Sequence, residues 1–175
     1  MTELAADWPQ QYHAWWNACR ELVAAHEWKA AFRSYPWPTF TTAPWTALPK
    51  PLAESRVALI SSSGVTAVGQ PPFDENILEG DPTWRIIATG NPLAAWTIRH
   101  GHYDPTAALK DYNTVFPLDV LRSLAKDGVI GDVAPRAISF IGFQTDAKRV
   151  LHEWAPRFAQ ILREDAVDAV LLVPV

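Results

Sequence analysis

Short apolar runs that alternate with helical patterns dominate the sequence after its first third and limit the folds open to it. Residues 56–60 and 137–141 are rich in β-branched and apolar side chains, and each run leads into a turn of small residues. A third run, 167–173, lies at the end of the sequence. Two weaker strand candidates, 84–88 and 95–98, lie between the first two runs. Strand, helix and strand joined by short connections favour right-handed crossovers and a largely parallel sheet. We therefore expect an α/β fold with helices on both faces of a mostly parallel sheet.

Two helices are predicted between these strands. Pro117 can occupy the first turn of a helix through Lys126, and Gly128 provides its stop. The apolar face of this helix comprises Leu118, Leu121, Leu124 and Ala125. A second helix should follow Thr145, with an apolar stripe that contains Pro156. Because proline lacks a backbone N–H, we expect a kink or a restart of the helix there.

The first fifty residues have a different composition, with six of the nine tryptophans. Apolar residues at roughly helical spacing predict one helix from Pro9 to Phe32. Residues 35–51 contain too many prolines for a helix or a central strand, so we expect an extended arm packed on the domain by its aromatic rings. Core packing explains these tryptophans better than an aromatic ligand cage does. The expected organisation is one α/β domain over 1–175, in which 1–50 form the helix and arm and 51–175 form the core.

Charge and composition exclude several functions. A net charge of −4 without any cluster of lysine and arginine argues against nucleic acid. No apolar run approaches the roughly 20 residues that cross a bilayer, and the first residues lack the basic and apolar segments of a signal peptide, so we expect a cytoplasmic protein without a membrane partner. Cys19 is the only cysteine, which precludes an internal disulfide or dithiol centre. It lies in the predicted N-terminal helix, where packing is its expected role.

Two turns that follow predicted strands carry the first candidate site. Ser62, Ser63 and Gly64 could leave backbone N–H groups free and allow a carboxylate to approach closely. Without a GxGxxG or GxxxxGK[ST] pattern, a tight turn with capping hydroxyls explains them equally well. Gly142 follows the other strand and joins the candidates for substrate binding, and Gln144 and Thr145 could also hydrogen-bond a substrate. For Thr145, capping the next helix is the better explanation.

A second candidate site contains closely spaced polar residues. On an extended segment His100, His102 and Asp104 project to one side, as in a metal site or a carboxylate-oriented general acid or base. No further metal ligand can be identified, and a structural polar network would give the same pattern. Asp104 could also simply start the turn at Pro105. With Asn113, His102 and Asp104 are the candidates for orienting a substrate or transferring protons.

Several segments, taken in order, resemble the selenoprotein B family of glycine, sarcosine, betaine and D-proline reductases, especially its shorter single-domain bacterial members. They follow Trp45 and are PLAESRVAL (51–59), QPPFD (70–74), HYD (102–104), DYN (111–113), VFPLD (115–119), GVIG (128–131) and VDAVL (167–171). The resemblance covers about residues 45 to 175. Tyr112 departs from the small aliphatic residue of many relatives, and the N-terminal Trp-rich helix has no counterpart that can be placed.

The resemblance implies reductive chemistry on a small amino acid or an N-substituted glycine. In such reductases a selenolate or thiolate attacks a carbon bound to nitrogen, the C–N bond breaks, and a dithiol supplies the electrons. A pyruvoyl group on a partner polypeptide activates the amine substrate, so reductase partner subunits are implied, while no cofactor is expected in this chain itself. A homo-oligomer remains possible.

The resemblance also suggests an interpretation of Val175. Similar relatives continue from an equivalent valine-rich strand into a redox-active selenocysteine or cysteine. We therefore expect a core truncated at its C-terminus, where a selenocysteine codon is read as a stop and the nucleophile is absent. The candidate residues should converge near Val175, because a proton-transfer group must lie within hydrogen-bond reach of the reacting atoms. Two alternatives stay open: a noncatalytic module that binds a small acid or a protein, and a metal-dependent enzyme that uses His100, His102 and Asp104.

Overall fold

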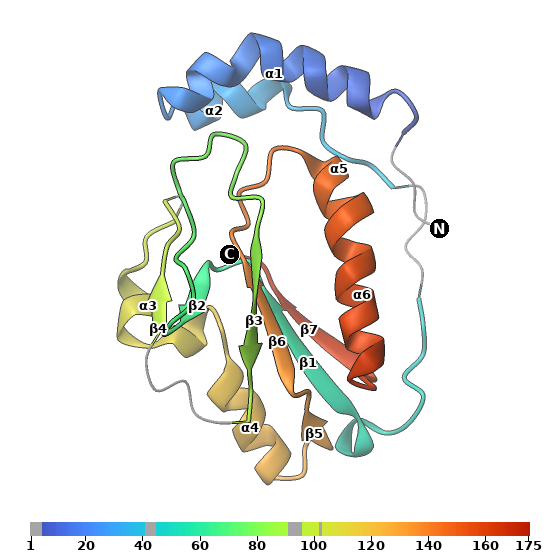
Figure 1. Ribbon diagram of the computed structural model, residues 1–175. Coiled ribbons are helices and arrows are strands. Elements are labelled where there is room, and N and C mark those ends of the chain that lie inside the picture. Colours follow the sequence, from blue (N-terminus) through green and yellow to red (C-terminus); the bar gives the residue numbers. More distant parts are fainter. Residues whose placement is uncertain (1–4, 41–44, 91–95, 102) are drawn as a thin grey trace.

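A five-stranded sheet forms the centre of the computed structural model, which describes residues 5–40, 45–90, 96–101 and 103–175 (Figure 1). Its strands are β1 (Arg56–Ser61), β3 (Trp84–Ala88), β5 (Asp132–Val133), β6 (Arg136–Phe140) and β7 (Ala169–Val173). Strand β1 runs parallel to β5 and β6 on one side and to β7 on the other, because Ser61 pairs with both Ser139 and Val173. Strand β3 pairs antiparallel with β6. The sheet is thus mixed but mostly parallel, as the sequence predicts.

Alternation along the strands gives the sheet two apolar faces. Val57 and Leu59 of β1 pack in one cluster with Leu118 and Leu121 of α4 (Leu118–Lys126). Ile60 of the same strand points to the opposite cluster, whose other buried members are Ile138, Trp154, Phe158 and Ile161. Successive side chains of a strand face opposite sides, so this division follows directly from the sequence. The prediction of helices on both faces is confirmed.

Prolines mark the two predicted helices as expected. Pro117 immediately precedes α4, and Gly128, just beyond its end, has a φ of 73°. The second helical segment consists of α5 (Ala147–Arg149), a π-helical turn η4 (Val150–Trp154) and α6 (Ala155–Glu164). Pro156 lies in the first turn of α6, directly after the π-helical turn. The predicted restart is therefore present. Pro156 has no N–H to donate to the preceding turn, and the change to π-helical geometry accommodates this missing hydrogen bond.

The strand expected at 95–98 belongs to a second, smaller sheet. Strands β2 (Val65–Ala67) and β4 (Trp96–Ile98) pair antiparallel with each other, and residue 95 lies outside the described residues. Gly64, with a φ of 71°, turns the chain away from β1 into β2. Its backbone oxygen accepts a hydrogen bond from Arg99 N at 3.2 Å. The segment then continues through α3 (Thr106–Lys110) and η3 (Tyr112–Thr114) to α4.

The N-terminal helix is interrupted where the sequence predicts continuity. It divides into α1 (Trp8–Ala24), α2 (Trp28–Ala31) and η1 (Phe32–Ser34). The break lies at His26, which adopts a φ of 61°. The N–H groups of His26 and Glu27 return to Val23 O and Leu22 O at 3.0 and 2.9 Å, the arrangement that closes many helices. Glycine usually occupies such a position, so its absence concealed the helix end in the sequence.

Two tyrosines attach this N-terminal unit to the turn after β6. The hydroxyl of Tyr35 donates to Thr145 O at 2.7 Å, and the Tyr12 hydroxyl lies 3.2 Å from Thr145 Oγ1. Thr145 N in turn donates to Glu79 O at 3.0 Å. The prediction that Thr145 caps the next helix is therefore wrong: Asp146 does so, accepting a hydrogen bond from Lys148 N at 3.0 Å. Thr145 instead joins the N-terminal unit to the core.

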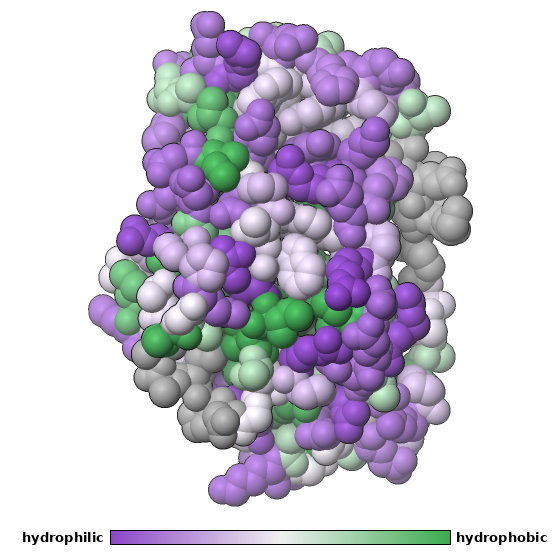
Figure 2. All heavy atoms as spheres, in the orientation of Figure 1, coloured by the Kyte–Doolittle hydropathy of each residue, from purple (hydrophilic) through white to green (hydrophobic). Residues whose placement is uncertain are grey.

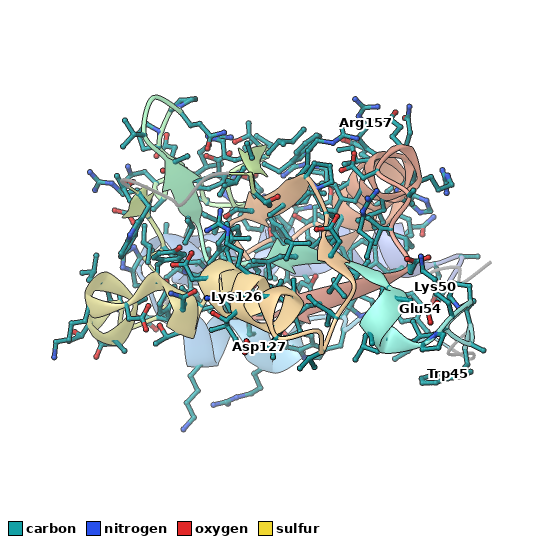
Figure 3. All side chains as sticks on the ribbon, turned by 90° about the horizontal axis from the view of Figure 1, so that it is seen from below. Trp45, Lys50, Glu54, Lys126, Asp127 and Arg157 are labelled. Carbon is teal, nitrogen blue, oxygen red and sulfur yellow. The ribbon has the colours of Figure 1, made fainter. Side chains whose placement is uncertain are left out.

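The arm between the N-terminal unit and the core is packed only at its start. Tyr35 is buried, and Pro36 O accepts a hydrogen bond from Trp8 Nε1 at 2.6 Å. By contrast, Trp37 is 66% exposed and Trp45 is 92% exposed, with its ring at the rim of the molecule (Figure 3). The expected packing by aromatic rings thus holds for Tyr35 and in part for Trp37, whose ring lies edge-on to that of Tyr35 at 4.8 Å between centroids, and it is wrong for Trp45. After the short η2 (Leu52–Glu54) the chain enters β1.

Hydrophilic residues cover most of the surface over α6 in the view of Figure 1, and apolar residues reach the surface over the central sheet and at the upper left, beside α2 (Figure 2). This distribution agrees with the burial of Phe158 and Ile161 beneath the helix. Among the described residues, no helix is both long enough and apolar enough to span a membrane.

The loop between β2 and β3 is organised by one buried carboxylate. Asp81 is 4% exposed, and its oxygens accept hydrogen bonds from Asp74 N at 2.7 Å, from Thr83 N at 2.8 Å and from the Thr83 hydroxyl. Asp81→Ala should lower the free energy of unfolding by about 2–3 kcal/mol, because it leaves buried donors without an acceptor. Urea denaturation monitored by circular dichroism measures this loss.

A matched control for that substitution is available in the same loop. The Asp74 side chain accepts only local hydrogen bonds from Asn76, in an exposed turn. Asp74→Ala should therefore change the free energy of unfolding by less than about 1 kcal/mol. Equal losses in the two variants would show that Asp81 does not hold the loop.

Candidate functional site

The carboxyl ends of β1, β6 and β7 meet at one edge of the sheet, where Ser62, Gly142 and Val175 come together. Ser62 N donates to Val173 O at 3.1 Å, and Gly142 N donates to Ser62 O at 2.9 Å. Ser62 Oγ accepts a hydrogen bond from Val175 N at 2.9 Å. Figure 1 shows the C-terminal residue beside these strand ends. Open α/β sheets bind ligands at this edge, so we name these three residues the carboxyl edge.

Close approach at the carboxyl edge requires the glycine. A Cβ on Gly142 would lie 2.9 Å from both Cβ and Oγ of Ser62 and 3.2 Å from Val175 O. A cavity of about 500 Å³ opens here, with walls from β1, β6 and the last residues of the chain: Ile60, Ser62, Phe140, Gly142, Leu172, Val173, Pro174 and Val175. Its walls are mostly apolar, which suits a site that keeps water from a reacting group.

The turn after β1 is already saturated with internal hydrogen bonds. Ser63 N donates to Ser61 Oγ at 3.2 Å, and Gly64 N donates to Phe140 O at 2.9 Å. The sequence predicts free backbone N–H groups in this turn, whereas those of Ser62, Ser63, Gly64 and Gly142 all donate within the protein. An anion cradle made of these four groups is therefore not formed. The turn instead fixes the geometry of the carboxyl edge.

The segment from His100 to Val115 lies against this turn through two contacts. The Tyr103 hydroxyl donates to Ser63 O at 3.3 Å, and Ser61 Oγ donates to Val115 O at 2.7 Å. His100 is buried, with its ring centroid 4.7 Å from that of Tyr103. His102 lies outside the described residues, so its role stays a prediction.

Asp104 and Asn113 organise local turns. Asp104 Oδ1 accepts hydrogen bonds from the backbone and hydroxyl of Thr106 at 3.0 and 2.6 Å, and these bonds hold the pKa of Asp104 below its usual range. Asp104 therefore initiates the turn at Pro105, as one of the two interpretations of the sequence predicts. Asn113 bonds to Asp111 Oδ1 at 3.0 Å and accepts from Asp119 N at 3.0 Å. Both residues lie on the segment that contacts Ser61 and Ser63, and these hydrogen bonds join them to Thr106, Asp111 and Asp119 rather than to Ser62 or Gly142.

No group of three or more histidine, cysteine, aspartate or glutamate side chains within the described ranges could hold a metal ion. Because His102 is outside these ranges, the set of His100, His102 and Asp104 is not tested as a whole. Cys19 is buried in the aromatic cluster of the N-terminal unit, with its sulfur 3.8 Å from Ser34 Oγ. Its surroundings match the packing role predicted for it.

Sequence reasoning missed a polar network between η3, α4 and β3. The Tyr112 hydroxyl donates to Asp119 Oδ2 at 2.5 Å, and Arg122 donates to Asp119 Oδ1 at 2.6 Å and to Thr89 O at 2.6 Å. Burial and the hydrogen bond to Asp119 raise the pKa of Tyr112. Burial alone would raise the pKa of Asp119, but hydrogen bonds from Tyr112, Arg122 and Asn113 outweigh it and hold that pKa below its usual range. The spacing of Asp119 and Arg122, three apart on a helix, was the available signal.

Asp119→Asn should make the protein less sensitive to acid. The pKa of Asp119 is lower in the folded protein than in the unfolded chain, so the ionised carboxylate stabilises the fold above about pH 4. This contribution is lost as the pH falls through the folded pKa. Between about pH 6 and about pH 3, thermal melts should therefore show a larger fall in Tm for the unsubstituted protein than for the variant.

Asp127→Asn serves as the control for acid sensitivity. Asp127 lies exposed just beyond the end of α4, and its replacement makes the same change in formal charge (Figure 3). The fall in Tm with acid should be unchanged in this variant. If both variants reduce acid sensitivity equally, net charge rather than the Tyr112–Asp119–Arg122 network determines it.

Comparisons with known proteins agree on one group of enzymes. The model of the family described as "Glycine/sarcosine/betaine reductase selenoprotein B" matches residues 21–175. D-proline reductase subunit gamma from Acetoanaerobium sticklandii is 38% identical over 128 residues, 73% of this chain and 52% of the relative. Glycine reductase complex component B subunit gamma from Symbiobacterium thermophilum is 32% identical over 140 residues, 79% of this chain and 32% of the relative.

A sarcosine reductase complex component B subunit beta from Peptoclostridium acidaminophilum gives the same values, 32% identity over 140 residues, with 79% and 32% coverage. The matched part of this chain thus spans about half the length of the first relative and about a third of the other two. No solved structure matches significantly. The stretch from α2 to β7, with the whole carboxyl edge, lies within the matched residues.

Proposed function

Because this chain belongs to the glycine/sarcosine/betaine reductase selenoprotein B family, we propose that it is a reductase component that helps cleave a C–N bond. The substrate is a small amino acid or an N-substituted glycine. A selenolate or thiolate attacks the carbon bound to nitrogen, a C–Se or C–S bond forms, and the amine leaves with a proton. A dithiol then cleaves this new bond reductively: the carbon gains a hydrogen, the selenol or thiol is released, and the dithiol becomes a disulfide. A low thiol or selenol pKa keeps the nucleophile ionised at neutral pH.

The observation that carries this proposal is the construction of the carboxyl edge. Ser62 Oγ accepts a hydrogen bond from Val175 N at 2.9 Å, and Gly142 leaves room for Val175 O. The adjoining cavity of about 500 Å³ is large enough for a small amino acid together with an attacking sulfur or selenium. The substrate would bind in this cavity beside Ser62 and Gly142.

The nucleophile is not among residues 1–175. Cys19 is the only cysteine, and it is buried between aromatic rings of the N-terminal unit. A cysteine or selenocysteine joined to Val175, or one on a partner polypeptide, would reach the cavity at the carboxyl edge. The proposal therefore assigns positioning to this chain: Ser62 and Gly142 hold the strand end, while Ser63 and Gly64 form the turn that supports it.

Proton transfer and substrate orientation are assigned to His102, Asp104 and Asn113. They are carried by the segment that contacts Ser61 and Ser63 through Val115 and Tyr103. Asp104 is exposed and stays ionised, so it can attract a substrate ammonium group. Asn113 is held by Asp111 and Asp119 and can serve as a neutral hydrogen-bonding group.

Partner subunits complete the proposed reductase. The relatives are named as subunits of reductase complexes. Strand β7 lies at the edge of the sheet and exposes apolar side chains, with Leu172 66% exposed and Val170 and Leu171 also accessible. Uncovered apolar edge strands favour pairing with another polypeptide segment. A partner would carry the pyruvoyl group, whose carbonyl activates the amine substrate.

A reduction assay with an engineered nucleophile tests the proposed function. The chain of 175 residues and a version with one cysteine appended after Val175 are each incubated with a pyruvoyl-bearing reductase partner subunit, a dithiol and D-proline, glycine, sarcosine or betaine. Both proteins carry Cys19→Ala, so that the appended thiol is the only one. Dithiol oxidation and release of the deaminated or ring-opened product should occur only with the appended cysteine.

Two results would contradict the proposal. Equal activity in both proteins would place the nucleophile elsewhere. If both are inert with every substrate while still binding one of them, the noncatalytic binding module replaces the reductase component.

A further inference from the structure

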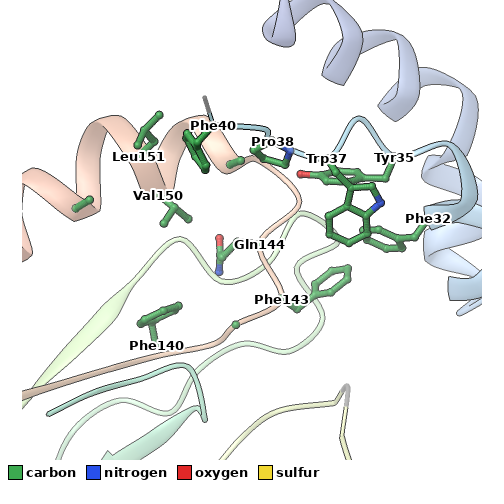
Figure 4. Close-up of a pocket in the computed structure, with 13 residues that line it drawn as sticks. Phe32, Tyr35, Trp37, Pro38, Phe40, Phe140, Phe143, Gln144, Val150 and Leu151 are labelled. Atoms are coloured by element: carbon green, nitrogen blue, oxygen red, sulfur yellow. The ribbon is translucent and has the colours of Figure 1, made fainter. Parts of the chain in front are cut away.

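A second cavity, of about 490 Å³, lies between the arm and the helical segment that follows β6 (Figure 4). We call it the aromatic cavity. Its main walls come from three separate parts of the chain: Trp37 and Phe40 of the arm, Phe140 and Phe143 beside the end of β6, and Val150 and Leu151 of the π-helical turn. None of the side chains that line it carries a formal charge. Its volume lies in the range of small-molecule sites.

Gln144 contributes a fixed polar group to this apolar cavity. Its Nε2 donates to Asp81 O at 2.8 Å and to Ile141 O at 3.1 Å. Both partners are carbonyl oxygens, so the amide nitrogen must face them and the Oε1 atom must face the other way. Gly80 permits this arrangement, because a Cβ there would lie 2.9 Å from Gln144 Nε2. The orientation of the amide is therefore determined by the fold.

The Oε1 atom of Gln144 is buried and has no hydrogen-bond partner among the described residues. In Figure 4 this oxygen points toward the side of the cavity formed by Val150 and Phe40. A buried acceptor without a donor is unfavourable, and buried polar groups are usually paired. A ligand that brings an N–H or O–H to this position would supply the missing donor.

The arm side of the cavity can open to admit such a ligand. Tyr35 is buried and anchored to Thr145 O, whereas Trp37 is 66% exposed and Phe40 is 48% exposed. Side chains with so much exposed surface lose few contacts when they move. The anchored wall, which includes Gln144, would remain in place.

From these observations we propose that the aromatic cavity is a binding site for an uncharged, mainly apolar small molecule that donates one hydrogen bond to Gln144 Oε1. The neutral walls select against a charged ligand, because no lining group compensates a desolvated charge. Aromatic rings on several sides favour a flat ring system. Phe140 and Gly142 line both this cavity and the one at the carboxyl edge, so the ligand would lie beside that edge.

Indole and 1-methylindole form a suitable pair of probes, because they differ by one N–H donor. Each is titrated into the ¹⁵N-labelled chain of 175 residues, and amide shifts around Phe143–Thr145 and Val150 report binding. Indole should bind at these positions, and 1-methylindole should bind roughly fivefold more weakly or worse, since it cannot donate to Oε1. Equal dissociation constants for the two probes, shifts confined to other regions, or no binding of indole at millimolar concentration would each overturn the proposal.

Variants sharpen this comparison. Gln144→Leu should abolish the difference between the two probes, whereas Trp37→Ala should weaken both equally. The matched control is Gln160→Leu on the exposed side of α6, which should leave both dissociation constants unchanged. Retention of the probe difference in Gln144→Leu would refute the role of Oε1. If that variant does not fold, the comparison of probes on the unsubstituted chain still decides. None of these results depends on reductase activity.

Discussion

Trp15→Ala is expected to lower the free energy of unfolding by about 3–5 kcal/mol. Trp15 is 4% exposed, and its ring centroid lies 5.3 Å from that of Phe32 and 4.8 Å from that of Tyr35, the latter in an edge-on contact. Its Nε1 donates to Ala31 O at 2.8 Å. Alanine would leave a large cavity between α1, α2 and the arm and would remove the side-chain hydrogen bond to Ala31 O. Urea denaturation followed by circular dichroism and tryptophan fluorescence measures the loss.

The same substitution at Trp45 provides the control. Trp45 is 92% exposed, so Trp45→Ala should change the free energy of unfolding by less than about 0.5 kcal/mol. A small effect for both variants would mean that the N-terminal cluster contributes little to folding. A separate early transition in Trp15→Ala, with a reduced denaturant dependence of the main transition, would show that this unit unfolds independently of the sheet.

Gly64→Ala is expected to cost at least about 3 kcal/mol, through two separate effects. Gly64 has a φ of 71°, which side chains other than glycine seldom adopt. In addition, a Cβ there would lie 2.2 Å from the backbone oxygen of Arg99. Backbone cannot move aside as the end of a side chain can, so the end of the β2–β4 pairing, where Gly64 meets Arg99, would have to open. Chemical denaturation and loss of dispersion in the amide NMR spectrum measure this effect.

Gly90→Ala separates these effects from the general consequences of removing a glycine. Gly90 lies in open space without a positive φ, so alanine should leave stability nearly unchanged or increase it by up to about 1 kcal/mol. Comparable destabilisation of both variants would contradict the account of Gly64. A stable Gly64→Ala protein with an undisturbed Arg99 would do the same.

Elements whose signals are local were predictable from the sequence. Helix α4 follows from Pro117 before its first turn and Gly128 beyond its last, and β1 and β6 follow from their apolar runs. The antiparallel pairing of β3 and the separate β2–β4 sheet were not predictable, because pairing partners are distant in sequence. The break at His26 was hidden because a residue other than glycine occupies the left-handed position.

The candidate site likewise has features that the sequence predicted and features that it did not. Ser62 and Gly142 could be placed together because parallel strands end at a common edge of the sheet. The N–H of Ser62 donates to Val173 O of β7 and that of Gly142 donates to Ser62 O, and these tertiary pairings had no signature in sequence. Asp104 illustrates a different limit, since an aspartate before a proline gives the same pattern as turn initiator or catalytic group.

The central claim is that a small amino acid binds in the cavity at the carboxyl edge. The most direct measurement is a titration of the ¹⁵N-labelled chain with D-proline, followed through amide chemical shifts. The account predicts saturable shifts centred on Ser62, Gly142 and Val175, which disappear when leucine replaces Gly142 in a variant that remains folded. No saturable shifts at these three residues, or shifts that persist unchanged in Gly142→Leu, would contradict it.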